Sequence, residues 1–160
     1  MKKLNKLFFL VSITSFLLVN TSCTESRSRN DDGVYVIGER MFISQVDHIF
    51  LNHRQYLGRS IKLEGFFSHD TWNNANWYSV LRNAPGCCGD DGEVGFIVTW
   101  NPDSLNVPNG NERYLYPAQN VWVEATGDLR EYRSQSISFL YLELSELNIL
   151  DRRGADFVSR

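Results

Sequence analysis

A short loop between two apolar runs holds the densest group of reactive side chains in the sequence. Residues 86–92 read Gly-Cys-Cys-Gly-Asp-Asp-Gly. Glycines allow backbone angles that other residues avoid, so this loop can fold tightly and bring thiols and carboxylates to one point. Two interpretations fit this pattern. Either the loop is a metal or thiol site, or it is a turn in which the cysteines are small buried hydrophobes and Asp91-Gly92 reverses the chain.

A site for a divalent soft metal, with zinc as the expected ion, is the sharpest chemical hypothesis. Cys87 and Cys88 would be thiolate ligands and Asp91 a carboxylate ligand, or an acceptor behind the ligands. Zinc accepts S, N and O donors and would keep the thiols reduced in an oxidising compartment. If one cysteine faces inward as filler, Cys88 and Asp91 remain the expected ligands, because adjacent cysteines rarely both bind one structural zinc. One imidazole would complete the site, from His48, His53 or His69.

Two other classes of function compete with the metal site. Thiol redox chemistry is disfavoured because the carboxylates around the cysteines oppose thiolate formation, and only Arg82 would favour it. A metal-free binding module is the stronger alternative, in which exposed aromatic side chains stack against an oligosaccharide or a protein partner. The best candidates for that surface are Trp72, Trp77 and Tyr78, although aromatic residues at alternating strand positions are more often core. The sequence has no Gly-x-Ser-x-Gly motif, paired His-Glu motif or phosphate loop, so we expect no enzymatic activity.

The N-terminus has the features of a secretory signal over residues 1–22. A basic start is followed by an apolar run that is too short for a membrane span and by small polar residues. Cys23 follows them, and this order resembles the lipobox of bacterial lipoproteins, with Asn20 where Leu or Val is usual. We therefore expect Cys23 to carry a lipid, residues 24–33 to form a flexible tether, and the protein to lie in the bacterial cell envelope, outside the cytoplasm.

Charge argues against a nucleic-acid partner. Removal of the predicted signal takes away Lys2, Lys3 and Lys6, so the 16 basic residues become 13 against 19 acidic ones, a net charge of −6. The remaining arginines are scattered along the chain, whereas a polyanion needs a concentrated basic face.

Periodicity predicts one mainly β domain over residues 34–150. Apolar residues recur at helical spacing over 41–54, after a short strand near 34–37. Strand-like alternation follows over 61–68, 77–81, 94–100, 121–127 and 137–150. A polar turn at 70–76 and a proline-rich segment at 101–120, which is either an insertion or a functional loop, separate these strands. This order predicts an amphipathic helix followed by a small OB-like barrel of five antiparallel strands, with bends or bulges at Gly65 and Gly127. Residues 151–160 are expected to be a frayed tail.

These segments resemble a known bacterial family. The resemblance rests on the helix, the strand that begins at Gly58-Arg59, the Cys87-Cys88-x-x-Asp91 loop with Gly95 after it, and the strand that begins at Val121-Trp122. In this order they are similar to the C-terminal domain of the two-gene permease membrane subunits, with Gly92 where alanine is usual. The resemblance implies a partner in an envelope or permease assembly and a link to metal handling. The membrane helices of that family are absent here, and the predicted lipid anchor takes their place.

Overall fold

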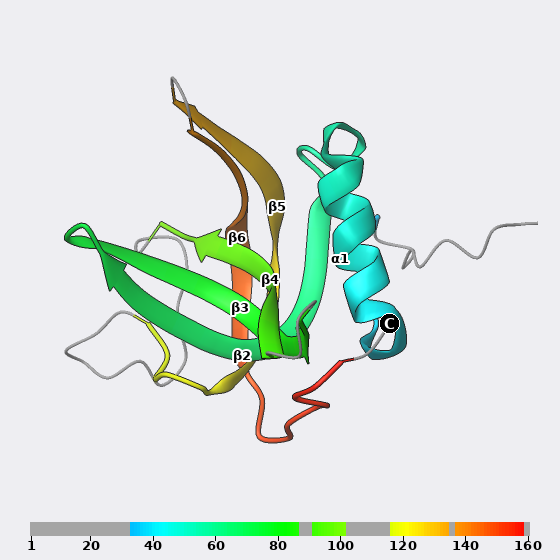
Figure 1. Cartoon of the computed structure of the whole chain (residues 1–160), viewed down its shortest axis with the longest axis vertical. Helices are drawn as coiled ribbons and strands as arrows, with labels where there is room; N and C mark the ends of the chain where they lie inside the picture. The colour runs from blue at the N-terminus through cyan, green and yellow to red at the C-terminus, as the bar shows by residue number, and fades with distance from the viewer. Residues whose placement is uncertain (1–32, 87–90, 102–115, 135–136, 159–160) are drawn as a thin grey trace, which may run out of the picture.

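The computed structural model describes residues 33–86, 91–101, 116–134 and 137–158. In chain order its elements are β1 (Tyr35–Val36), the 3-10 helix η1 (Glu39–Met41), α1 (Phe42–Leu51), the 3-10 helix η2 (His53–Gln55), β2 (Ser60–Trp72), β3 (Ala75–Pro85), β4 (Asp91–Thr99), β5 (Trp122–Ser134) and β6 (Ile137–Ile149) (Figure 1). The predicted signal, Cys23 and most of the predicted insertion lie outside the described residues. Within the described residues, no helix has the length and apolarity needed to cross a membrane.

Strands β2 to β6 close into a barrel, which confirms the OB-like prediction. Their order is β2-β3-β4-β6-β5, and β5 pairs with β2 to complete the ring. All these pairings are antiparallel except β4 with β6, which is parallel. The sequence-based prediction of a fully antiparallel barrel therefore needs this one correction. The reason is geometric, because strand directions cannot alternate all the way around a ring with an odd number of strands.

Glycine occupies two places where another strand approaches closely, and at Gly127 the predicted bulge is present. A Cβ built on Gly65 would lie 2.4 Å from the carbonyl oxygen of Leu81, and one on Gly127 would lie 2.6 Å from that of Glu143. The register between β5 and β6 also shifts at Thr126 and Gly127, which is a bulge. At both positions another strand's backbone approaches too closely for any side chain.

Gly65→Ala is therefore expected to destabilise the barrel by about 1–3 kcal/mol, because the new methyl group must displace the backbone of β3. Chemical denaturation measures this change. Gly38→Ala is the matched control, since the nearest atom to a Cβ there is 3.8 Å away. Equal stability of the two variants would contradict the argument.

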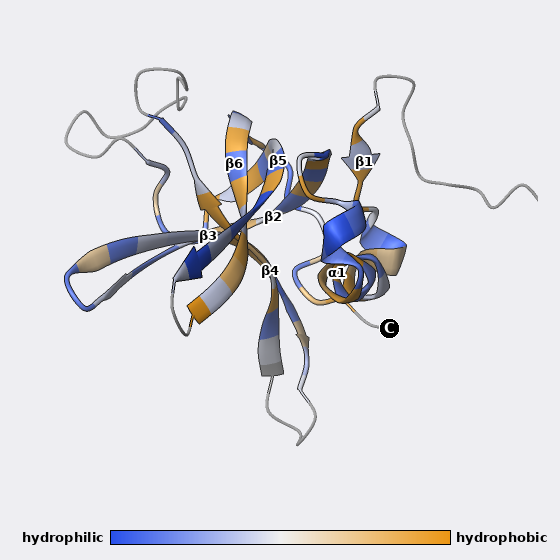
Figure 2. Cartoon of the chain, turned by 90° about the horizontal axis from the view of Figure 1, so that it is seen from above, coloured by the Kyte–Doolittle hydropathy of each residue, from blue (hydrophilic) through white to orange (hydrophobic). Residues whose placement is uncertain are grey.

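The core lies inside the ring and under α1. Phe42, Ile43, Val46 and Ile49 are the buried face of this helix, and they join the inward residues of the strands in one cluster. Figure 2 shows apolar and polar residues mixed along the strands and along α1, which lies beside the barrel. Phe50, which belongs to the same helix, is 43% exposed. The predicted helical segment is shorter as an α-helix and continues as 3-10 turns at both ends.

The first hairpin is longer than the sequence predicted. Strands β2 and β3 stay paired out to Trp72 and Ala75, so only Asn73 and Asn74 form the turn. Both have positive φ angles, of 51° and 60°. Asparagine tolerates this left-handed conformation, and such turns match the twist of a hairpin.

The C-terminal segment is ordered up to Val158, in contrast to the predicted frayed tail. Asn83 of β3 donates its amide proton to the carbonyl of Asp156 and accepts one from Val158, both at 2.9 Å. The side chain of Val158 is only 3% exposed. Residues 151–158 therefore pack against β3 as part of the domain.

Candidate functional site

The cysteine loop joins two paired strands, as predicted. Pro85 at the end of β3 lies opposite Asp91 at the start of β4. Cys87 and Cys88 lie outside the described residues, and only the backbone of Asp91 is described. Within the described part of the chain, no group of three or more His, Cys, Asp and Glu side chains is placed to hold a metal ion. The thiol-based site stays a prediction.

Two of the candidate histidines lie at the C-terminal end of α1. The Nδ1 atom of His48 is 3.3 Å from the side-chain nitrogen of Asn52. His53 follows in η2, with its Nδ1 3.2 Å from the carbonyl oxygen of Phe50. Local hydrogen bonds of the helix end therefore engage one nitrogen of each ring.

The third histidine, His69, lies elsewhere, in an aromatic cluster at one end of the barrel. Its ring is 5.2 Å from that of Tyr78 and 4.7 Å from that of Tyr116. Its Nε2 is buried and has no hydrogen-bond partner among the described residues. Tyr78 also contacts Phe67 and Trp100 in this cluster. Burial, helped by the nearby Tyr116, raises the pKa of the Tyr78 hydroxyl, so this ring stays neutral.

An aromatic groove of about 350 Å³ crosses the outside of the barrel. Trp77 meets Phe139 edge-on at 5.5 Å, and Phe139 stacks on Tyr132 at 5.0 Å. Nine of the ten lining residues belong to β3, β4 and β6, and Tyr132 comes from the end of β5: Ala75, Asn76, Trp77, Tyr78, Ile97, Val98, Thr99, Tyr132, Phe139 and Tyr141. None of these residues carries a charge at neutral pH.

The three predicted contact aromatics therefore have different positions. Trp77 lies in the groove, with its Nε1 buried and unbonded among the described residues. Tyr78 borders the groove but stacks mainly in the cluster around His69. Trp72 is 65% exposed at the hairpin end and does not line the groove. The sequence did not predict Tyr132, Phe139 and Tyr141 as site residues, although their positions in alternating strands are a usable signal.

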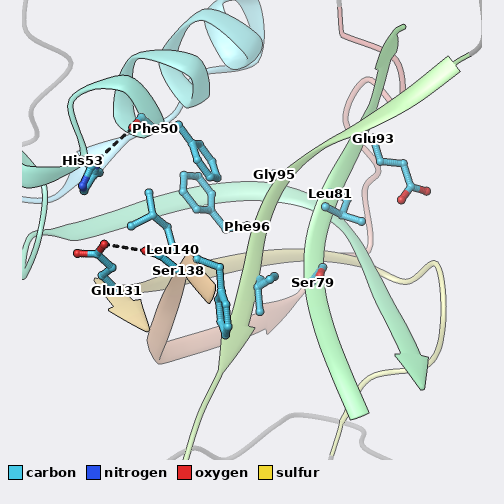
Figure 3. A pocket seen from close by; sticks show the side chains of 12 residues that line it. Phe50, His53, Ser79, Leu81, Glu93, Gly95, Phe96, Glu131, Ser138 and Leu140 are labelled. Atoms are coloured by element: carbon cyan, nitrogen blue, oxygen red, sulfur yellow. Dashed lines mark hydrogen bonds between the residues drawn. The ribbon is translucent and has the colours of Figure 1, made fainter. Parts of the chain in front are cut away.

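A second cavity, of about 370 Å³, lies between α1, β4 and β6, and we call it the seam pocket (Figure 3). It lies beside the parallel seam, where β4 and β6 pair only over residues 97–99 and 141–143. Its lining residues combine apolar rings and chains with two carboxylates: Phe50, His53, Ser79, Leu81, Glu93, Gly95, Phe96, Ile97, Glu131, Ser138, Phe139 and Leu140.

Arg82 is a buried residue that sequence analysis did not identify as structural. Its side chain is 2% exposed and lies between the rings of Phe42 and Trp122, at 4.9 and 5.0 Å. Its Nε donates to the carbonyl of Glu64 at 2.8 Å, and Nη1 donates to that of Ala155 at 3.3 Å. Burial lowers the pKa of this guanidinium, against the opposing effect of Glu39 and Glu64. Arg82 thus links α1, β2, β5 and the C-terminal segment.

Comparison with known proteins gives a family and a structural relative. No curated protein matches the chain at a significant level. One solved structure, the dimeric N-terminal domain of PriB protein from Thermoanaerobacter tencongensis, is similar with 14% identity and a TM-score of 0.32, over 58% of this chain and 97% of that one. A family model, the DUF1980 C-terminal domain, matches residues 20–153. That match spans most of the sequence and includes the lining residues of the two cavities described above, so the chain belongs to the family of DUF1980 C-terminal domains.

Proposed function

We propose that this chain is a non-enzymatic, lipid-anchored binding module of the bacterial cell envelope, which holds an uncharged oligosaccharide in the aromatic groove. The groove is the observation that carries the proposal. Its neighbouring rings from β3, β5 and β6 form a continuous apolar surface, with Trp77, Phe139 and Tyr132 in direct contact. In OB folds, the outer face of the second and third barrel strands is a common place for oligosaccharides and oligonucleotides. Here these strands are β3 and β4.

The chemistry of the groove favours a sugar over a nucleic acid. Sugar rings have apolar faces that stack on aromatic rings and hydroxyl groups that need hydrogen-bond partners. The groove offers both, since Asn76, Thr99 and the tyrosine hydroxyls lie among the rings. A nucleic acid would need cations to balance its phosphates, and none lines the groove.

Loss of one groove ring is expected to weaken sugar binding about tenfold, since an aromatic contact contributes roughly 0.5–1.5 kcal/mol beyond its buried area. Residues 24–160 would be titrated by calorimetry with linear oligomers of N-acetylglucosamine and of glucose. Trp77→Ala and Tyr132→Ala test the groove. Trp72→Ala is the matched control, because this tryptophan is exposed outside the groove. Absence of binding to both oligomers at millimolar concentration, or equal losses in Trp72→Ala and Trp77→Ala, would overturn the proposal.

A second candidate function is zinc binding at the cysteine loop, within a permease-type assembly of the envelope. One specific observation favours it. The pairing of Pro85 with Asp91 places the ends of β3 and β4 side by side, so the carboxylate-bearing residue lies at the base of the loop that holds both cysteines. Thiolates and a carboxylate at such a base are donors that zinc accepts.

Elemental analysis of purified residues 24–160, which hold Cys87 and Cys88 but not Cys23, tests this candidate. We expect close to one zinc per chain and its loss in Cys88→Ser, because serine does not replace a thiolate ligand. Asp90→Asn is the matched control, since it lies in the same loop and is not a predicted ligand. Zinc retained by Cys88→Ser, or a wild-type chain free of metal with two titratable thiols, would exclude the site.

A further inference from the structure

We propose that the seam pocket is a second binding site, at which an extended cationic segment of a partner protein adds as a strand along β4. This site lies next to the aromatic groove, with which it shares Ile97 and Phe139. It differs in charge, because Glu93 and Glu131 line it whereas no residue of the groove is charged, and it does not rest on the sugar-binding proposal.

The strands that border the pocket are paired over only part of their length. Strand β4 pairs with β3 over residues 91–98 but with β6 only over 97–99. Strand β6 pairs with β5 along its whole length but with β4 only over 141–143. Residues 91–96 and 137–140 therefore each have one edge without a strand partner in the described part of the chain. Unpaired edges of this kind accept an extended peptide through main-chain hydrogen bonds.

The cavity exposes the backbone of β4 along its edge without a strand partner. Gly95 lines the pocket, and because glycine has no side chain, its contribution is the peptide backbone itself. A side chain cannot be added there, since a Cβ on Gly95 would lie 2.1 Å from the carbonyl oxygen of Val80. Residue 95 therefore presents only its backbone to the pocket.

Apolar side chains line the pocket beside this edge of β4. Figure 3 shows Phe50 and Phe96 together at the helix side of the pocket, and their rings stack at 5.3 Å. Leu140, from β6, lies near Glu131 and Ser138 in the same view. Phe50 is 43% exposed although it belongs to a helix that packs on the core. In strand addition, alternate side chains of the added peptide enter such pockets.

The acidic residues of the pocket favour a cationic occupant. The pocket is lined by the carboxylates of Glu93 and Glu131 and, as its only other titratable group, the imidazole of His53. Arg133 and Ser138 both donate to Oε1 of Glu131 and lower its pKa, so this carboxylate stays ionised near neutrality. Oε2 accepts no hydrogen bond from a described residue, which leaves one oxygen of the Arg133–Glu131 ion pair for a lysine or arginine of the incoming strand.

Hydrogen exchange of the full chain tests this proposal with a defined probe. The probe is the acetylated and amidated peptide Thr-Lys-Val-Lys-Val-Lys-Thr, which alternates cationic and apolar side chains. At saturation we expect exchange of amides within 91–96 of β4 to slow by about tenfold or more, since new main-chain hydrogen bonds protect them. The same peptide with alternate amides N-methylated is expected to bind at least about tenfold more weakly, because it cannot pair with an edge.

A double variant tests the charge selection. Glu93→Gln combined with Glu131→Gln should weaken peptide binding about threefold or more, whereas Glu146→Gln, an exposed control on the same strand as Leu140, should leave it unchanged. Three results would overturn the proposal: no binding of the probe at millimolar concentration, equal binding of the N-methylated peptide, or protection confined to the short outer edge at Tyr35–Val36. Because the sugar titration uses different residues, its failure leaves this test independent.

Discussion

Arg82→Ala is expected to lower the free energy of unfolding by about 3–5 kcal/mol. The substitution removes two hydrogen bonds from the guanidinium to backbone carbonyls and its contacts with the rings of Phe42 and Trp122. It also leaves a cavity at the point where helix, barrel and C-terminal segment meet. The release of a buried cation from its desolvation penalty offsets only part of this loss. Thermal unfolding should shift downward by roughly 10–20 °C.

Arg130→Ala is the matched control for this prediction. Like Arg82, Arg130 is a charged side chain of a barrel strand. It makes ion pairs with Asp128 at 3.3 Å and Glu143 at 2.9 Å, but it is 42% exposed. Solvent screens such pairs, and the loss is expected to stay below about 1 kcal/mol. Similar losses in the two variants would show that burial of Arg82 contributes nothing to stability.

Removal of residues 151–160 is expected to cost about 3–5 kcal/mol of stability. The truncation exposes the surface that Val158 covers, which corresponds to roughly 1.5–3 kcal/mol, and removes the two backbone hydrogen bonds to Asn83, at about 0.5–1.5 kcal/mol each. It also takes away the carbonyl of Ala155, which accepts a hydrogen bond from Arg82. Denaturation of the truncated and full chains with urea gives the difference.

A shorter truncation separates this effect from the mere loss of chain length. Removal of Ser159 and Arg160 alone keeps Val158 and its bonds to Asn83. We expect that variant to be as stable as the full chain. If both truncations leave stability unchanged, residues 151–158 are a tail after all, as their sequence first indicated.

The parts of the fold that sequence analysis predicted correctly are those with local periodicity. Alternation predicted the strands, helical spacing predicted α1, and the glycines at 65 and 127 marked the bends because only glycine fits a close backbone approach. Sequence analysis predicted a turn over 70–76, whereas the turn consists of Asn73 and Asn74 alone. Polar residues indicate that a turn is present, but they do not determine where strand pairing ends.

The parts that were missed depend on tertiary contacts. Arg82 occupies an inward position of β3, between Val80 and Ala84, which are both buried. Alternation did therefore contain a signal for its burial, but its charge argued against it. The C-terminal segment has no periodicity at all, and its order arises from bonds to one residue of β3.

The aromatic groove could not be assembled from the sequence for a related reason. Trp77 and Phe139 meet only because β6 returns beside β4, and no local pattern specifies that pairing. Trp72 and Trp77 have the same chemistry and are five positions apart, yet one lies in the groove and the other is largely exposed at the hairpin end.

The parallel join between β4 and β6 is the shortest in the ring, and this has a mechanical consequence. The other neighbouring strands of the ring pair over at least seven residues each. Strands β4 and β6 pair only through residues 97–99 and 141–143. We therefore expect the barrel to open first between β4 and β6 when it is heated or subjected to force. Ile97 belongs to this pairing and borders both cavities. A ligand bound in either cavity would therefore contact the β4–β6 pairing and stabilise the closed barrel.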